Sequence, residues 1–151
     1  MLTCTFFGHR DVDYFPYQEK IEAILIGLIQ NCGVTQFYSG YRGNFDRLCA
    51  HLVWELKFRY PQIKNTLVLS YLPYKKEDFI LPKFFDDSLY LLEKPVPPRF
   101  AIPHTNRKMV DLSDYILSGV NHDYGGAFTA CSYARTHGKT VIDIYDEMGG
   151  R

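Results

Sequence analysis

Three segments of the chain place glycine beside polar and cationic side chains. They are Gly8-His9-Arg10, Ser39-Gly40-Tyr41-Arg42-Gly43 and Gly125-Gly126-Ala127-Phe128-Thr129. Glycine lets backbone N–H groups approach an anion, and the planar guanidinium group of arginine binds phosphate through paired hydrogen bonds. The carboxylate of Asp46, just beyond the second segment, can accept a hydrogen bond from a sugar hydroxyl. The three segments therefore predict a site for a small molecule that carries phosphate.

We expect side chains and amides from all three segments to bind this ligand, with Tyr41 as a stacking surface and Arg107 as a further cation. Arg107 is chosen from Asn106-Arg107-Lys108 because adjacent cations on a helix point in different directions, so at most one of them faces a ligand. The predicted binding residues are Gly8, His9, Arg10, Ser39, Gly40, Tyr41, Arg42, Gly43, Asp46, Arg107, Gly125, Gly126, Ala127 and Thr129.

Each segment also has a purely structural interpretation. Gly125-Gly126 can be a plain turn from a strand to a helix, Asp46 can cap the helix that follows it, and His9 can be an exposed turn histidine without a task. No cofactor is predicted. A metal site is not expected, because no paired ligand spacing occurs among the five histidines, His9, His51, His104, His122 and His137.

The elements that position these segments alternate along the chain. Apolar, β-rich runs predict strands over residues 2–7, 34–39, 66–72, 115–120 and 141–145. Helical spacing of apolar residues predicts helices over 17–32, from Asn44 or Asp46 to Pro61, from Pro103 to 112, and over 126–137. This order is typical of an α/β, Rossmann-like doubly wound fold, with a mainly parallel five-stranded sheet and helices on both faces. The carboxyl ends of its strands would bring the glycine segments together.

The whole chain, 1–151, is expected to form a single domain, interrupted by an irregular insertion over 74–102. Residues 84–92 have the pattern of a short helix, whereas Pro95, Pro97 and Pro98 oppose regular structure. A segment of this length is a lid over the crevice or an excursion without function. Both interpretations remain open.

The composition limits the classes of binding partner and the cellular compartment that we expect for the protein. The 17 basic and 17 acidic residues cancel, which argues against long nucleic acids as partners, because these usually need a basic excess. The four cysteines form no Cys-x-x-Cys pair and fit reduced thiols in the cytoplasm. The apolar run over 23–29 is too short to cross a bilayer, so no membrane partner is expected.

Four motifs, in the order in which they occur, resemble the SLOG superfamily. They are Phe7-Gly8-His9-Arg10, the Ser39-Gly40-x-Arg42-Gly43-x-Phe45-Asp46 loop, Asn106-Arg107-Lys108-Met109-Val110-Asp111, and Gly125-Gly126-Ala127-Phe128-Thr129. This Rossmann-like group joins the cytokinin-activating LOG phosphoribohydrolases to DprA-type proteins. The chain is most similar to small bacterial and phage SLOG proteins that begin with a Gly-His-Arg motif. The resemblance implies binding of a nucleotide or a nucleotide-derived signal, and it makes a homodimer plausible.

The LOG enzymes cleave the N-glycosidic bond of nucleoside 5′-monophosphates, and the chain departs from their pattern. Arg107 matches their arginine, but Cys131 or Ser132 stands where they carry a glutamate after the glycine turn. Asp46 or Asp123 could supply that carboxylate from another loop. Three functions therefore remain open: nucleotide sensing or sequestration, phosphoribohydrolase activity with Arg107 and Asp46 as catalytic groups, and protein interaction or dimerisation without a ligand.

Overall fold

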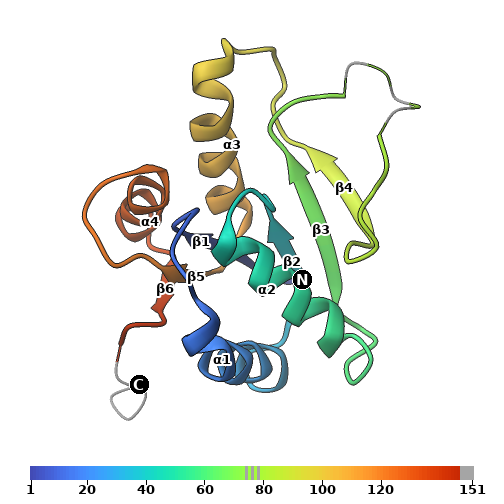
Figure 1. The fold of residues 1–151 in the computed structure, drawn as a ribbon, viewed down its shortest axis with the longest axis vertical. Coiled ribbons are helices and arrows are strands. Elements are labelled where there is room, and N and C mark those ends of the chain that lie inside the picture. The colour runs from blue at the N-terminus through green and yellow to red at the C-terminus, as the bar shows by residue number, and fades with distance from the viewer. Residues whose placement is uncertain (74, 76, 78, 147–151) are drawn as a thin grey trace.

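The computed structural model describes residues 1–73, 75, 77 and 79–146, and its strands form one layer with helices packed on either side (Figure 1). The strands are β1 (Leu2–Gly8), β2 (Val34–Ser39), β3 (Lys64–Leu69), β4 (Asp87–Tyr90), β5 (Tyr115–Gly119) and β6 (Thr140–Asp143). The helices are α1 (Gln18–Gln30), α2 (Asn44–Leu56), α3 (Pro98–Leu112) and α4 (Gly126–Thr136), with a short 3-10 turn, η1 (Phe15–Tyr17), before α1.

The sheet is parallel throughout, with the strand order β4-β3-β2-β1-β5-β6. From β1 the chain builds outward to β4 on one side and then crosses over to β5 and β6 on the other. The expected α/β Rossmann-like fold is confirmed, with six strands in place of the expected five. In such sheets ligands bind beyond the carboxyl ends of the strands, where the direction of winding reverses. Here that point lies between β1 and β5.

The sheet separates two hydrophobic clusters, so its central strands are apolar on both faces. Phe6 faces the cluster formed with α1 and α2, and the next residue, Phe7, faces the cluster formed with α3 and α4. Figure 1 shows these two helix pairs on opposite sides of the strands. On α4 the residues that pack inward are small, Ala130, Cys131 and Ala134, and this allows the helix to lie close to α3 and the sheet.

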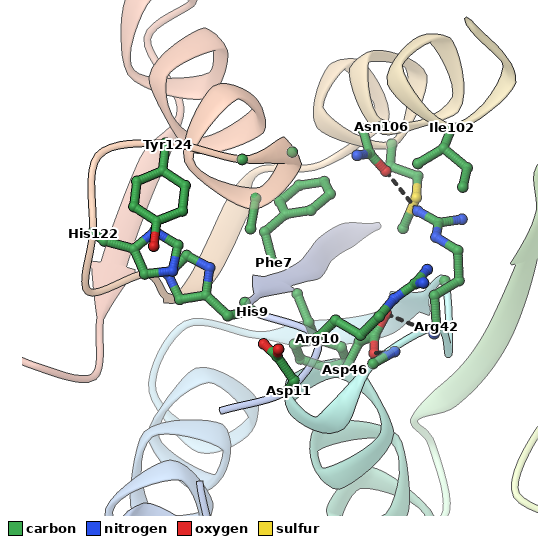
Figure 2. A pocket seen from close by; sticks show the side chains of 18 residues that line it. Phe7, His9, Arg10, Asp11, Arg42, Asp46, Ile102, Asn106, His122 and Tyr124 are labelled. Atoms are coloured by element: carbon green, nitrogen blue, oxygen red, sulfur yellow. Dashed lines mark hydrogen bonds between the residues drawn. The ribbon is translucent and has the colours of Figure 1, made fainter. Parts of the chain in front are cut away.

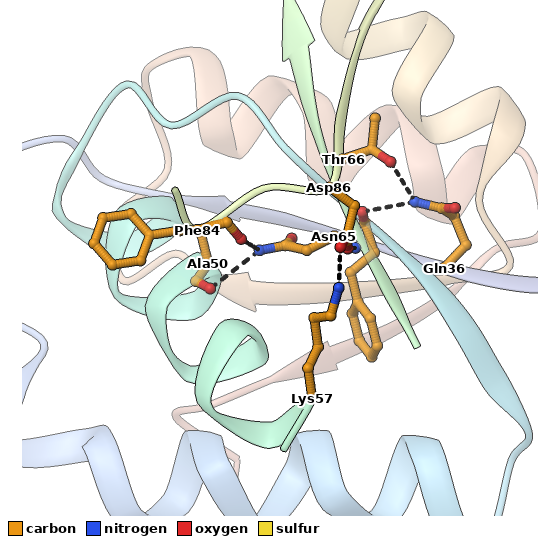
Figure 3. A network of polar contacts seen from close by, with 8 residues as sticks. Gln36, Ala50, Lys57, Asn65, Thr66, Phe84 and Asp86 are labelled. Carbon is orange, nitrogen blue, oxygen red and sulfur yellow. Dashed lines mark hydrogen bonds and ion pairs between the residues drawn. The ribbon is translucent and has the colours of Figure 1, made fainter. Parts of the chain in front are cut away.

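The expected helix over 84–92 is wrong, because Asp87–Tyr90 pairs with β3 as a parallel edge strand. Asn65 and Asp86 begin this pairing through two hydrogen bonds of 2.8 Å, one of which runs from the Asn65 amide to the Asp86 carboxylate. The Asn65 side chain also donates to the carbonyl groups of Ala50 and Phe84, and Lys57 forms an ion pair with Asp86 (Figure 3). These contacts between distant segments outweigh the local helical pattern.

The start of α3 also differs from expectation, because the helix begins at Pro98 and continues through Pro103. Pro98 occupies the first turn, where a missing N–H costs nothing, and Ala101 and Thr105 are buried on either side of Pro103. The expected irregular insertion thus contains β4 and the first part of α3. Its residues 74, 76 and 78 lie outside the described residues, and the lid and the one-domain organisation remain predictions.

None of the helices in the described ranges combines the length and the apolar character that crossing a bilayer requires.

Candidate ligand-binding site

A cavity of about 410 Å³ opens where β1, β2 and β5 end, and the three glycine segments meet there (Figure 2). The first segment contributes the loop after β1, the second the loop between β2 and α2, and the third the start of α4. One side of α3 completes the wall. The lining residues are Phe6, Phe7, Gly8, His9, Arg10, Asp11, Gly40, Arg42, Gly43, Asp46, Ile102, Asn106, Met109, His122, Tyr124, Gly125, Gly126 and Ala127.

The first two loops are held together by close backbone packing. A Cβ atom on Gly43 would lie 2.6 Å from the Cα atom of Arg10, and the amide of Asn44 donates to the Arg10 carbonyl at 2.8 Å. The buried ring of Phe45 fills the space beneath, and a Cβ atom on Gly8 would lie 2.2 Å from it. Packing therefore already requires glycine at positions 8 and 43.

The carboxylate of Asp46 caps its own helix. It accepts hydrogen bonds from the amides of Arg42, at 3.0 Å, and Gly43, at 2.8 Å, near the N-terminus of α2. The hydroxyl of Ser39 is buried in the same turn, where it accepts from the Tyr41 amide and donates to the Asp46 carbonyl. These contacts fix the shape of the loop.

Two residues of the second glycine segment do not line the cavity, and one of them is Ser39. The other is Tyr41, whose backbone adopts a positive φ of 55°. The ring of Tyr41 packs on Phe84, Phe85 and His51, and its hydroxyl lies 2.8 Å from Nε2 of His51. The predicted stacking surface is therefore part of the packing between α2 and the segment before β4.

Arg42 carries a half-buried positive charge, and its guanidinium group donates hydrogen bonds to two neutral side chains. Its Nη1 donates to the Ser70 hydroxyl at 2.8 Å, and its Nη2 donates to Oδ1 of Asn106 at 2.7 Å. Burial lowers the pKa of Arg42 from its ordinary value; the Asp46 carboxylate opposes this shift and the Arg10 charge adds to it. Among the described residues no carboxylate forms an ion pair with Arg42 or Arg10. This end of the cavity thus presents two positive charges that form no ion pair, with the Asp46 carboxylate nearby and bound to backbone amides.

The N-terminus of α4 forms a second group of donors. Gly125 turns the chain with a φ of 93°, and the first intrahelical bond runs from the Thr129 amide to the Gly125 carbonyl. The amides of Gly126 and Ala127 therefore have no intrahelical acceptor, and the helix dipole adds positive potential. A Cβ atom on Gly126 would meet nothing within 4 Å. Neither packing nor backbone conformation requires glycine at position 126, whereas close approach of a ligand would.

Three rings stack at the other end of the cavity, as Figure 2 shows. The ring centroids of His9 and His122 are 3.4 Å apart, and those of His122 and Tyr124 are 3.9 Å apart. Nε2 of His9 accepts a hydrogen bond from the Asn121 amide at 3.1 Å, so His9 is neutral in this arrangement. Burial lowers the pKa of His9, the His122 ring lowers it further, and the Asp11 carboxylate opposes the shift.

Arg107 and Thr129 lie outside this cavity. They line a neighbouring cavity of about 160 Å³ between α3 and α4, where the Arg107 guanidinium carbon lies 5.8 Å from the centre of the Tyr133 ring. The residue before Arg107, Asn106, borders both cavities. Asn106 lies four residues after Ile102 and three before Met109, so the apolar spacing of α3 contained the signal for its inward position.

The residues that stand in place of the missing carboxylate, and the candidate substitute Asp123, lie outside the cavity. Cys131 is buried in the cluster between α4 and the sheet, and burial raises the pKa of its thiol. Neither Ser132 nor Asp123 lines the cavity. Asp11, His122 and Tyr124 also line the cavity, although they are not among the predicted binding residues. No local spacing indicates these three, because they meet only when the β1 and β5 ends are adjacent.

Neither a family model nor a curated protein matches the chain in sequence. Solved structures do match its fold. DNA processing protein A (DprA) from Streptococcus pneumoniae superposes with a TM-score of 0.69 at 17% identity, covering 98% of this chain and 52% of its own length. DprA from Helicobacter pylori gives a TM-score of 0.67 at 16% identity, with coverages of 97% and 66%. The present chain thus spans about half of one DprA chain and two thirds of the other.

A third structure is a molybdenum cofactor binding protein from the phototrophic bacterium Rippkaea orientalis, with a TM-score of 0.58 and 16% identity over 94% of this chain and 75% of that one. Together these likenesses confirm the expected resemblance at the level of the fold, because the chain has the Rossmann-like fold found in the DprA proteins.

One expectation about partners is corrected by the comparisons. The Helicobacter pylori structure is described as showing a single-stranded DNA binding mode, which contradicts the exclusion of long nucleic acids drawn from zero net charge. Net charge is a sum over the whole surface, whereas one cavity needs only a few local cations and amides to hold phosphate. Cytoplasmic location and homodimer formation stay predictions.

Proposed function

We propose that the protein binds a nucleotide or a nucleotide-derived small molecule in the cavity at the carboxyl end of its sheet. One observation carries this proposal: Arg42, held between Ser70 and Asn106, Arg10 beside it, and the free amides at the start of α4 all border one cavity. Partial burial of a guanidinium group that forms no ion pair costs free energy, and a bound phosphate would relieve that cost. Backbone amides at a helix N-terminus bind the same kind of anion.

The size of the cavity and the fold support a ligand of this class. Cavities that bind small molecules usually measure about 300–1,000 Å³, and a volume of about 410 Å³ falls within that range. The neighbouring structures include proteins described as binding single-stranded DNA and a molybdenum cofactor. A nucleotide unit of phosphate, sugar and base occurs in free nucleotides and in a single strand, so both sources belong in the test.

The surroundings of Asp46 and Asp11, two carboxylates on the cavity wall, favour ligand binding over glycosidic hydrolysis. Both oxygen atoms of Asp46 already accept amide hydrogen bonds, so this side chain cannot turn to a sugar without uncapping α2. Among the residues that the structure describes, Asp11 is the other carboxylate on the cavity wall, and it is exposed to solvent. We therefore expect AMP to release no free base on incubation with the protein. Release of adenine that is lost in Asp11→Asn would favour the hydrolase instead.

Calorimetric titration with ADP, ADP-ribose, cyclic nucleotides and a short dT oligomer tests the proposal, using two matched pairs of variants. Gly126→Ala adds a methyl group at the cavity, and Gly27→Ala adds one on α1, where its closest neighbour would be 4.0 Å away. Arg10→Ala and Lys108→Ala each remove one exposed cation, but only Arg10 lines the cavity.

We expect Arg10→Ala to weaken binding about tenfold, as the loss of one charge-assisted hydrogen bond does. Gly126→Ala should also weaken binding about tenfold, because the added methyl group would keep the anion away from the amides at the start of α4. Gly27→Ala and Lys108→Ala should bind as the unmodified protein does. The proposal fails if the folded protein binds none of these molecules, or if both members of each pair lose affinity equally.

A further inference from the structure

We infer that the stacked rings of His9, His122 and Tyr124 are the wall that receives the flat ring of the ligand, with Arg10 and Arg42 holding its anionic end. This inference rests on the proposed function and adds to it an orientation of the ligand and a preference for nucleotides over phosphates without a base. Figure 2 shows the ring stack and the two arginines at opposite ends of the cavity, with Phe7 between them.

The geometry of the stack leaves one face open. His9 and His122 are inclined by 17°, and His122 and Tyr124 by 20°, so the three rings are close to parallel. His122 covers one face of Tyr124, while Tyr124 as a whole remains 67% exposed and borders the cavity. A nucleobase placed on the open face would continue the stack at the same spacing. Stacking of this kind accepts any base, because every base has a π-face.

Stability alone does not explain the stack. Tyr124 lies on an exposed loop and belongs to neither of the clusters that fill the two sides of the sheet. Within the described part of the chain, Nδ1 of His122 is buried and has no hydrogen-bond partner. An arrangement that leaves a buried nitrogen unpaired while exposing a large aromatic side chain costs stability. Recognition of a flat ring gives a reason for keeping it.

The base of the stack is firmly anchored to the sheet. The His9 amide donates to the Tyr14 hydroxyl at 2.8 Å, and that hydroxyl donates to the Gly119 carbonyl at the end of β5. In addition, Nε2 of the His9 ring accepts a hydrogen bond from the Asn121 amide. The end of β1 and the loop after β5 are thus tied to the same imidazole. A stacking surface that is already in place spares the ligand the entropy cost of ordering it.

The experiment compares ADP with pyrophosphate, because the two share their phosphate chemistry and only ADP carries a base. Both are titrated into the unmodified protein, Tyr124→Ala and Tyr124→Phe, with Phe58→Ala as a control that removes another exposed ring, 78% accessible and outside the cavity. We expect Tyr124→Ala to weaken ADP binding by about tenfold or more and to leave pyrophosphate binding unchanged. Tyr124→Phe keeps the ring and should stay within about twofold for both, as should Phe58→Ala.

The inference is overturned if Tyr124→Ala binds ADP as tightly as the unmodified protein does, an outcome that leaves the proposed function intact. It is also overturned if Tyr124→Ala weakens ADP and pyrophosphate equally, because Tyr124 would then act on the anionic end or on the shape of the cavity. Absence of binding to both probes by the unmodified protein would refute the proposed function and this inference together. Because Tyr124 is exposed, thermal unfolding of Tyr124→Ala should match that of the unmodified protein.

Discussion

His9 lies where three features of the site meet. Its amide bonds to Tyr14, its ring nitrogen accepts from Asn121, and its ring stacks on His122. An imidazolium ring has no acceptor nitrogen, so protonation of His9 would break the contact with Asn121. Burial and the neighbouring imidazole both oppose that protonation, and they lower the pKa of His9 from its usual value of 6.5.

This lowered pKa makes stability depend on pH. In the unfolded chain His9 has its ordinary pKa of 6.5 and binds a proton as the pH falls below that value, whereas the folded protein does not. The contribution of His9 to stability is therefore complete above pH 6.5 and is lost as the pH falls toward the lowered pKa of the folded state. We expect the urea midpoint to decrease between about pH 7.5 and pH 5.

The variant His9→Gln separates this effect from other titrations, because a glutamine oxygen accepts a hydrogen bond and does not titrate. His51 also has a pKa lowered by burial, and it remains in both proteins. The decrease in midpoint should be smaller in His9→Gln than in the unmodified protein. Equal decreases in the two proteins would show that His9 does not couple folding to pH.

The sequence predicted which loops border the cavity better than it predicted which side chains face it. Glycine next to arginine identified Arg42, because a glycine-rich turn and a guanidinium group both bind phosphate. Arg107 was chosen for its charge, although its neighbour Asn106 has the helical spacing of an inward residue. His122 and Tyr124 form a site only by stacking on His9, and that contact depends on strand order.

The ring of Phe45 holds the N-terminus of α2 against the sheet. This ring fills the space beside Gly8 and Gly119, which end the neighbouring strands β1 and β5. A Cβ atom on Gly119 would lie 2.5 Å from this ring and 2.9 Å from that of Tyr14. Gly119→Ala should therefore destabilise the protein by about 1–3 kcal/mol through overpacking. Chemical denaturation measures the loss, with Gly27→Ala as the matched substitution on an open helix surface. A Gly119→Ala protein as stable as Gly27→Ala would contradict this account of the docking.

The elements themselves were predictable in proportion to their local signal. The sequence predicted the amphipathic helices and the buried strands at 2–7 and 34–39, because each carries an uninterrupted apolar pattern. The edge strand β4 has only four residues, and none of them is fully buried. What makes it a strand is its pairing with β3, begun by Asn65 and Asp86, and this information lies outside the segment.

Over the whole chain the basic and acidic residues are equal in number, and the cations that line the cavity are Arg10 and Arg42. A single strand held through these two cations should release few counterions on binding. We expect the logarithm of its association constant to fall with the logarithm of salt concentration at a slope of about −1.4, from two phosphate contacts. Fluorescence anisotropy of a labelled dT oligomer over a salt series measures this slope. A much steeper slope would show that the oligomer also contacts cations outside the cavity.

The buried ring of Phe45 couples the movements of the loops that form the rim of the cavity. The ring occupies the space beside Gly8 and Gly119, and Phe45 lies in the first turn of α2, the helix that follows the second loop, so none of these loops can shift outward without moving the others. The mouth of the cavity should therefore loosen as one cooperative unit, with its amides exchanging hydrogen in concert instead of loop by loop.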